Sequence, residues 1–151
     1  MKKAAEVAQA SEFIEKMDGK YEARIAQGGT NVSGGQRQRL SIARAIAKNP
    51  DIYIFDDAFS ALDMKTDAKL RQALKPITQE AVTLIVAQRI GTIRDAEQII
   101  VLDQGKMVGK GKHEELLRDC EVYREIAKSQ LSDAEFAAEM KVAKQKGGKN
   151  A

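Results

Sequence analysis

The chain has 151 residues, of which 43% are hydrophobic and 31% charged, so we expect one folded domain and exclude a disordered or collagen-like chain. Aromatic residues make up only 5% and tryptophan is absent, so the core has to be built mainly from Ile, Leu, Val and Ala. The net charge of +3 comes from the last eleven residues, which hold four lysines and no acid, while the rest of the chain carries 21 basic and 22 acidic groups. A basic face for nucleic acid is therefore not expected.

No segment approaches a membrane span of roughly 18 consecutive apolar residues, and the N-terminal residues are too highly charged for a secretory signal. The single cysteine, Cys120, cannot form an internal disulfide, which fits a reducing compartment. Its position in a helical stretch predicts a packed, inert thiol.

Hydrophobic periodicity and turn residues predict these elements in chain order: an amphipathic helix over 4–17, an irregular segment over 20–32, a helix from 33 to about 48, a strand over 52–55, a helix over about 65–74, strands over 82–87 and 98–102, a hairpin turn at 104–106, and helices over 114–118 and 122–129. Ser132 and Glu135 form the capping-box pattern of a last helix, and the tail beyond Gln145 is expected to be loose. The continuous apolar runs at 52–55 and 82–87 favour strands covered on both faces. Strands that alternate with helices predict an α/β fold with a mainly parallel sheet.

The most informative stretch is Ser-Gly-Gly-Gln at residues 33–36. Ser33 can cap the following helix, and Gln36 completes a capping box. Two glycines in a first helical turn cost about 1 kcal/mol each relative to alanine, so their benefit has to lie elsewhere. Because they lack side chains, Gly34 and Gly35 let their amides approach an anion at the positive end of the helix dipole, beside the Ser33 hydroxyl. This is the chemistry of a phosphate contact; a capped helix with a glycine kink is the alternative.

Two acids, Asp56 and Asp57, follow directly after the apolar run at 52–55. A P-loop NTPase positions its Mg²⁺ carboxylate in this way, at the carboxyl end of a strand. A second acid at that place can orient or deprotonate the water that attacks a γ-phosphate. A helix cap or a solvated turn is the alternative reading of the two acids.

Four stretches match a known family in order and spacing: Asn31 to Gln36, Ile52 to Asp57, Ser60 to Asp63 and Ile85 to Arg89. Together they resemble the C-terminal half of an ABC transporter nucleotide-binding domain, of the exporter type with fused membrane helices, and the resemblance covers roughly residues 4–131. It implies a partial P-loop NTPase fold of the α/β class, with a mainly parallel sheet flanked by helices and without the Walker A half.

The resemblance also implies a role for each candidate site residue. Ser33 to Gln36 correspond to the signature motif, which contacts the γ-phosphate of ATP held by the opposite domain of a dimer. Asp56 corresponds to the Walker B carboxylate for Mg²⁺, and Asp63 to the D-loop aspartate that touches the partner. Residues 26–29 occupy the place of the exporter X-loop, although the usual Gly-Glu pair is Ala-Gln in this chain.

Three departures from the family pattern bear on activity. No Gly-x-x-x-x-Gly-Lys-Ser/Thr occurs in the sequence, so the phosphate-binding loop is expected upstream of Met1. Asp57 stands where the family has its catalytic glutamate and is shorter by roughly 1.5 Å. Gln88 stands where the family has its switch histidine; it can hydrogen-bond a phosphate but carries neither proton nor charge. Asp57 and Gln88 together resemble the degenerate half of a heterodimeric exporter.

We therefore expect this chain to contribute the signature and Walker B motifs to the ATPase of a membrane exporter, at the cytoplasmic face of the cell membrane. Its expected partners are a second nucleotide-binding domain, in a heterodimer, and the membrane-spanning domains, with no nucleic acid; its expected cofactors are ATP and Mg²⁺. The isolated chain is expected to be cytoplasmic and inactive, and to expose the sheet edge and apolar face that the missing half covers. Two alternatives remain, namely a non-transport ABC ATPase acting on DNA or translation and a non-enzymatic, pseudogene-like remnant.

The resemblance divides the chain into residues 1–131, the C-terminal part of the nucleotide-binding domain, and residues 132–151, a C-terminal helix and basic tail. The lysine tail is expected to be solvated, with anionic lipid or nucleic acid as the alternative contact. The only histidine, His113, is expected to be a helix cap or a surface residue.

Overall fold

A computed structural model describes residues 1–147, which form two compact units that meet in the sequence between Val86 and Ala87. Helices and strands occur in both units, so the predicted α/β class is confirmed. Within this part of the chain, every helix is too short or too polar to cross a bilayer.

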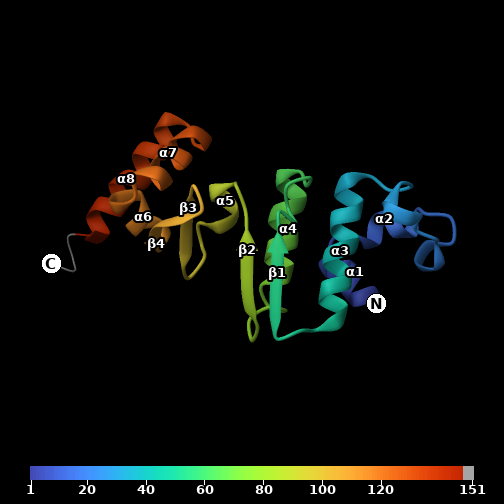
Figure 1. Cartoon of the computed structure of the whole chain (residues 1–151). Coiled ribbons are helices and arrows are strands. Elements are labelled where there is room, and N and C mark those ends of the chain that lie inside the picture. Colours follow the sequence, from blue (N-terminus) through green and yellow to red (C-terminus); the bar gives the residue numbers. More distant parts are fainter. Residues whose placement is uncertain (148–151) are drawn as a thin grey trace. The chain divides into compact units, whose positions relative to one another are not determined.

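The first unit is built on a pair of parallel strands. Its elements in chain order are α1 (Lys2–Val7), α2 (Ser11–Glu15), the 3₁₀ turns η1 (Lys20–Glu22) and η2 (Gln27–Gly29), α3 (Gly34–Lys48), β1 (Ile52–Asp56), α4 (Met64–Leu74) and β2 (Val82–Val86). The strands pair from Ile52 with Val82 to Asp56 with Val86. Helix α4 lies in the crossover that parallel strands require, and α1 runs alongside α3 (Figure 1). The helices and strands predicted between residues 33 and 87 are confirmed.

The continuous helix predicted over 4–17 is wrong, because the chain breaks at Gln9, between α1 and α2. Gln9 has a φ of 57°, in the left-handed region. The amide of Ala10 donates to the carbonyl of Ala5 at 2.7 Å, which is the bond of a Schellman helix end. The Gln9 carbonyl accepts from Nη1 of Arg39, 30 residues further along the chain, at 2.6 Å. A contact with α3 therefore stabilises the break.

The core of the first unit lies on one side of its two strands. The buried cluster combines residues of β1, α3 and α4: Tyr53, Phe55, Ile42, Ile46, Leu70 and Leu74. The alternate residues of β1 are exposed, Ile52 to 59% and Ile54 to 66%, and Leu84 of β2 is exposed to 52%. The prediction that these strands are covered on both faces is therefore wrong for the described residues, and the predicted exposed apolar face is confirmed. An apolar run indicates that a strand needs cover, but not which segment supplies the cover.

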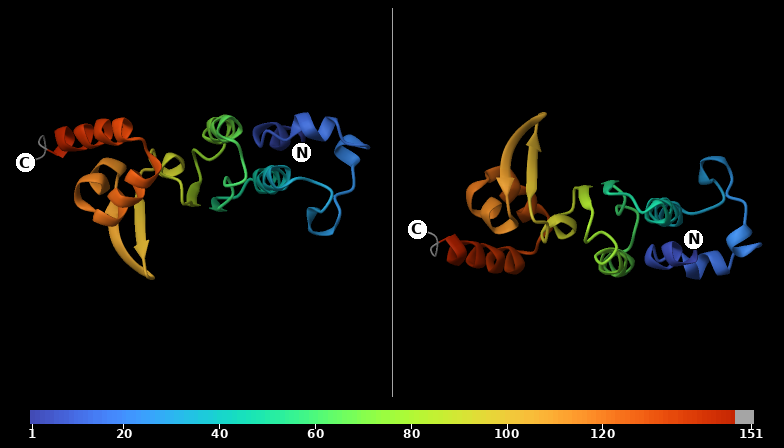
Figure 2. Two further views of the ribbon diagram at one scale, coloured as in Figure 1. Left: turned by 90° about the horizontal axis from the view of Figure 1, so that it is seen from above. Right: turned by 90° about the horizontal axis from the view of Figure 1, so that it is seen from below.

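As far as residue 147, the second unit combines a β-hairpin with four helices. Its elements are α5 (Ile90–Ile93), β3 (Ile99–Asp103), β4 (Lys106–Gly111), α6 (His113–Asp119), α7 (Glu121–Gln130) and α8 (Asp133–Gly147). β3 and β4 are antiparallel, so a parallel sheet is found only in the first unit. The predicted turn is confirmed, with Gln104 and Gly105 at φ values of 47° and 73°. Figure 2 shows helix α6 beside the hairpin.

His113 is buried, with 5% of its surface exposed, so the predicted surface or capping position is wrong. Its Nδ1 lies 2.7 Å from the hydroxyl of Tyr123 on α7, and its Nε2 lies 2.9 Å from Oε2 of Glu139 on α8. The other oxygen of Glu139 pairs with Arg94 at 3.0 Å. Burial raises the pKa of Tyr123 to about 12. The imidazole is buried because two later helices supply its hydrogen-bond partners.

Two further predictions for this unit are confirmed. Cys120 is buried and unpaired, and it packs so closely on β4 that a Cβ added to Gly109 would stand 2.8 Å from its sulfur. The start of α8 carries the expected capping box, in which the Ser132 amide donates to Oε2 of Glu135 at 2.9 Å. The tail predicted to be loose beyond Gln145 is helical as far as Gly147, the last residue of α8, and residues 148–151 lie outside the described residues.

Candidate functional site

At the start of α3 the amide of Gln36 is capped, whereas the amides of Gly34 and Gly35 are open. The hydroxyl of Ser33 accepts from the Gln36 amide at 3.2 Å, and the Gln36 side chain accepts from the Ser33 amide at 2.9 Å. The predicted capping box is thus present. Among residues 1–147, no acceptor is recorded for the amides of Gly34 and Gly35. Two donors at the positive end of a 15-residue helix therefore remain available to an anion.

The two glycines differ in how closely other parts of the chain approach them. A Cβ on Gly35 would stand 3.0 Å from the carbonyl oxygen of Ala61, so a larger residue would require α3 or the loop after β1 to shift slightly. A Cβ on Gly34 would meet nothing nearer than the Cβ of Ala61 at 3.9 Å, an ordinary van der Waals contact. Packing within the described chain therefore explains Gly35 but leaves Gly34 without an internal reason. From the sequence alone the two glycines are equivalent, so this difference was not predictable.

Gln38 joins this helix to the loop that follows β1, a role that sequence reasoning missed. Its Nε2 donates to the backbone oxygen of Asp57 and to the hydroxyl of Ser60, each at 3.1 Å. Its Oε1 accepts from the amide of Ala61 at 3.0 Å. One carboxamide thus fixes the loop between the Walker B and D-loop candidates, Asp56 and Asp63, to the second turn of α3. No local signal predicts this, because the partners are 19 to 23 residues away.

Residues 26–29, which the resemblance compares with the X-loop, are held to the same helix. Nη1 of Arg37 donates to the carbonyl of Gly28 at 2.8 Å. Asn31 closes the loop from inside, because its side chain accepts from the Ala26 amide and donates to the Arg24 carbonyl, both at 2.9 Å. The start of α3 therefore has fixed contacts with the preceding loop as well as with the following one.

The acidic candidates lie at the carboxyl end of β1 and in the loop after it. Asp56 is the last residue of the strand and is exposed. Asp57 is also exposed; its φ of 49° is left-handed, which aspartate tolerates better than most residues, and its amide donates to the Val86 carbonyl at 3.0 Å. Asp63 caps α4 by accepting from the Thr66 amide at 2.9 Å, and hydrogen bonding from Thr66 lowers the pKa of this carboxyl. The structure thus places the signature, Walker B and D-loop candidates in the first unit.

The carboxylates fit a magnesium ion that is bound mainly through a substrate. Among residues 1–147 there is no group of three or more acidic, histidine or cysteine side chains that could hold a metal. Mg²⁺ usually takes one or two carboxylates and completes its shell with water and phosphate oxygens. Asp56 is exposed at the end of the strand and is compatible with that arrangement. Within the described residues, it is not compatible with a site in which protein side chains supply all the ligands.

Gln88 belongs to the second unit and is exposed. Its backbone oxygen accepts from Nε2 of Gln130 at 2.7 Å, and Oε1 of Gln130 accepts from the Ile90 amide at 2.9 Å. The segment that holds Gln88 is therefore bound by the last residue of α7. Sequence reasoning missed Gln130, because nothing local distinguishes it from an exposed glutamine that has no distant partners.

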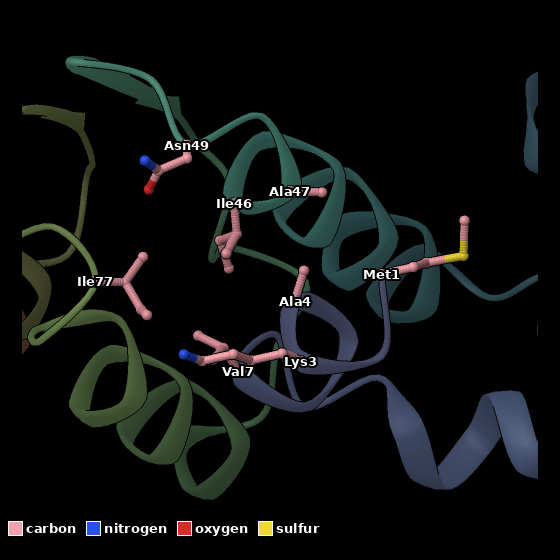
Figure 3. A pocket seen from close by; sticks show the side chains of 8 residues that line it. All are labelled: Met1, Lys3, Ala4, Val7, Ile46, Ala47, Asn49 and Ile77. Atoms are coloured by element: carbon pink, nitrogen blue, oxygen red, sulfur yellow. The ribbon is translucent and has the colours of Figure 1, made fainter.

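A shallow pocket lies at the opposite end of α3 from Ser33 (Figure 3). It is lined by Met1, Lys3, Ala4, Val7, Ile46, Ala47, Asn49 and Ile77. This lining is mostly apolar, and its only charged side chain is Lys3. It offers no set of polar groups that would fix a substrate.

Comparison with known proteins agrees with the geometry of the first unit. Residues 2–60 match the family described as ABC transporter. A solved structure of a bacterial Atm1-family ABC exporter with ATP bound is similar over 86% of this chain and 23% of that one, with a TM-score of 0.82 and 36% identity. The chain is therefore part of the ATP-binding domain of an ABC transporter. The similar proteins include an exporter, a flippase and an export protein.

The chain is 53% identical over 134 residues to an uncharacterized ABC transporter ATP-binding protein of Mycobacterium tuberculosis, covering 89% of this chain and 23% of that protein. It is 41% identical over 133 residues to the ATP-dependent lipid A-core flippase of Aliivibrio fischeri, covering 88% and 23%. It is 46% identical over 134 residues to a β-(1→2)glucan export ATP-binding/permease protein of Rhodopseudomonas palustris, covering 89% and 22%. The chain thus spans less than a quarter of the length of these relatives.

Proposed function

We propose that this chain supplies the signature, Walker B and D-loop residues to the ATPase of an ABC exporter. The observation that carries the proposal is the start of α3. Gly34 has an open amide and no packing reason to be glycine, in a helix whose other first-turn features are explained by the chain itself. A ligand that needs close approach to the backbone, such as a phosphate, explains the remaining glycine.

In this function the chain acts on ATP held by a second nucleotide-binding domain. The amides of Gly34 and Gly35 donate to the γ-phosphate, and the Ser33 hydroxyl stands beside them. Asp56 would hold Mg²⁺ at the chain's own ATP site, where the ion neutralises charge that develops on the phosphates. The chain's sequence holds no phosphate-binding loop, so the cradle for that ATP comes from another segment.

The same proposal makes this site a weak hydrolytic one. The carboxylate of Asp57 is shorter than the family's glutamate, and a misplacement of about 1 Å can cost roughly 10²-fold in rate. The exposed side chain of Gln88 can donate to a phosphate but cannot shuttle a proton. These two residues support a heterodimer in which the intact signature motif of this chain serves the partner's competent site. Membrane-spanning domains and a place at the cytoplasmic face of the membrane belong to the same proposal.

The exposed strand face supports a function in assembly. Ile52, Ile54 and Leu84 are each more than half exposed, and a patch of this kind on a domain normally contacts another surface. The rest of a nucleotide-binding domain is the cover that the relatives' greater length supports.

The test is complementation. The chain is co-expressed with the Mycobacterium tuberculosis relative truncated to remove the matching 134 residues. Hydrogen exchange of residues 33–36 is then compared with and without Mg²⁺ and a non-hydrolysable ATP analogue. We expect slower exchange in the assembly with nucleotide, and no nucleotide binding by the isolated chain. Micromolar ATP binding by the isolated chain, or an assembly whose helix start does not respond to nucleotide, contradicts the proposal.

Two variants make the test specific. Ser33→Ala and Ser132→Ala each remove the serine of a capping box, at the starts of α3 and α8 respectively. Both lose a comparable local bond, but only Ser33 stands beside two glycine amides. The nucleotide response is therefore expected to fall with Ser33→Ala and to persist with Ser132→Ala.

A further inference from the structure

We propose that Gln130 is a positioning residue for the switch position, because its carboxamide holds the backbone on both sides of Arg89 and so sets where Gln88 presents its side chain. The functional part of this inference rests on the proposed function, since Gln88 matters only if it faces nucleotide. The structural part stands on two hydrogen bonds within the second unit.

The two bonds use the whole carboxamide. Nε2 of Gln130 donates to the Gln88 carbonyl at 2.7 Å, and Oε1 accepts from the Ile90 amide at 2.9 Å. Gln130 is 42 and 40 residues from these partners, so the contact depends on the fold and not on the local sequence.

Residues 87–89 lie outside any helix or strand, so no regular ladder bonds their backbone groups. The N-cap residue of α5, Arg89, makes no side-chain capping bond to the helix. The first amide of that helix, at Ile90, is one of the orphan donors of a helix start, and Gln130 supplies its acceptor. Two backbone groups that bracket Arg89 thus depend on one side chain.

The support of Gln130 is itself well anchored. It is the last residue of α7, whose Tyr123 and Ala127 are buried at 2% and 0% exposure. Tyr123 is hydrogen-bonded to the buried His113 of α6. A second tie reaches the same region from α8, where Glu139 pairs with Arg94 at the end of α5. The segment from Gln88 to Arg94 is thus fixed at its beginning by α7 and at its end by α8.

The consequence is a defined link, within the second unit, between the end of α7 and the backbone of the candidate switch residue Gln88. A displacement of the end of α7 moves the Gln88 carbonyl and the start of α5 together, since one rigid carboxamide plane binds both. Glutamine is suited to this task because it offers a donor and an acceptor at one group. An ionised glutamate offers only acceptors, and alanine offers neither.

The first experiment uses the chain as it stands and compares Gln130→Ala and Gln130→Glu with the unsubstituted protein. Ser129→Ala is the matched control, because the Ser129 hydroxyl makes only a local bond to the Ile126 carbonyl. Amide exchange of Ile90 is expected to become at least about tenfold faster in Gln130→Ala, and to stay unchanged in Ser129→Ala, while amides in β3 remain protected in both. An unchanged exchange rate of the Ile90 amide in Gln130→Ala overturns the proposed role of Gln130.

The glutamate variant adds a signature that loss of packing cannot produce. A protonated carboxyl, like a carboxamide, offers both a donor and an acceptor, whereas the ionised form cannot donate to the Gln88 carbonyl. The amide shift of Ile90 in Gln130→Glu is therefore expected to approach that of the parent chain as pH falls through about 4. A shift that does not titrate contradicts the proposed geometry.

The second experiment uses the assembly described for the proposed function. Gln130→Ala is expected to keep the nucleotide response of residues 33–36 and to lose that of residues 88–90. A parent-like response at 88–90 overturns the positioning role. If the unsubstituted assembly shows no response in either segment, the proposed function fails instead. The exchange of the Ile90 amide in the isolated chain still tests whether Gln130 holds this backbone.

Discussion

The backbone oxygen of Ala61 lies 3.0 Å from the point at which a Cβ on Gly35 would stand. Gly35→Ala is therefore expected to lower the stability of the chain by about 1 kcal/mol, because overpacking costs about 1–3 kcal/mol and the entropic gain of alanine is only about 0.4–1 kcal/mol. Gly34→Ala is expected to raise stability by about 0.4–1 kcal/mol, since its Cβ has room. Urea unfolding of the two variants checks this, and shifts of the same sign would contradict it.

The two serine caps give a second prediction. Ser33→Ala and Ser132→Ala are each expected to lower stability by about 1 kcal/mol, the usual loss of an N-cap. Hydrogen bonding from Ser132 lowers the pKa of Glu135, so only Ser132→Ala is expected to return that pKa toward its ordinary value of 4.5. Carboxyl titration by NMR measures it. The same titration in Ser33→Ala is the control and should leave Glu135 unchanged.

The exposed strand face predicts an effect on assembly. Ile54→Lys is expected to increase the solubility of the isolated chain and to prevent complementation, because the residue is 66% exposed on the face that needs cover. Val142→Lys on α8, where valine is 45% exposed, is the control and should leave complementation intact. Light scattering and co-purification measure the two effects. Normal complementation by Ile54→Lys would show that this face is not the assembly surface.

Two buried tyrosines should respond oppositely to loss of the hydroxyl. Among the described residues, the Tyr53 hydroxyl is buried without a hydrogen-bond partner, so Tyr53→Phe is expected to be neutral or stabilising. Tyr123→Phe is expected to cost about 1–2 kcal/mol at neutral pH, because it leaves the Nδ1 of buried His113 without its partner. Thermal unfolding distinguishes the two, and equal effects would be inconsistent with this structure.

Tyr123 also predicts an alkaline limit to stability. Its pKa is raised from 10.0 to about 12 in the folded state, so the unfolded chain releases the proton first as pH rises. The stabilisation is complete below pH 10 and is lost between pH 10 and about 12. Unfolding across this range should show a decline in the parent chain that Tyr123→Phe reduces. A decline of equal size in the variant would assign the loss to other groups.

Hydrolysis in the assembly should respond to the two departures from the family pattern. Asp57→Glu with Gln88→His is expected to raise turnover at this site, because a longer carboxylate and a proton-carrying imidazole are restored. Part of the gain is offset by the left-handed φ of residue 57, which glutamate tolerates less well than aspartate. Asp103→Glu, the same chemical change at the end of β3, is the control. Unchanged turnover in the double variant would show that other features limit this site.

Features that depend on local chemistry were predictable from the sequence. The Ser33 and Ser132 caps and the Gly105 turn are set by residues within four positions of one another, and the structure contains all three. The two acids at the carboxyl end of β1, Asp56 and Asp57, were predictable for the same reason, because they directly follow the apolar run in the sequence. The family roles of these residues come from the resemblance and remain to be tested.

Features that depend on distant partners were not predictable. The break at Gln9 is stabilised by Arg39, and the burial of His113 depends on Glu139, which is 26 residues further on. Gln38 and Gln130 have no distinguishing local pattern, since each acts on backbone groups far away in the sequence. The exposure of Ile54 could not be read from its apolar run, because a hydrophobic pattern does not say which segment covers it.

The bare face of β1 and β2 ties the cellular fate of this chain to the supply of its complement. In the isolated chain, a strip of branched aliphatic side chains is exposed to solvent. Chaperones bind such strips, and proteases degrade the chains that expose them. Abundance then follows the stoichiometry of assembly and not the rate of synthesis. Overproduction of this chain alone should yield rapid turnover, and co-production of the segment that covers the strip should lengthen its half-life.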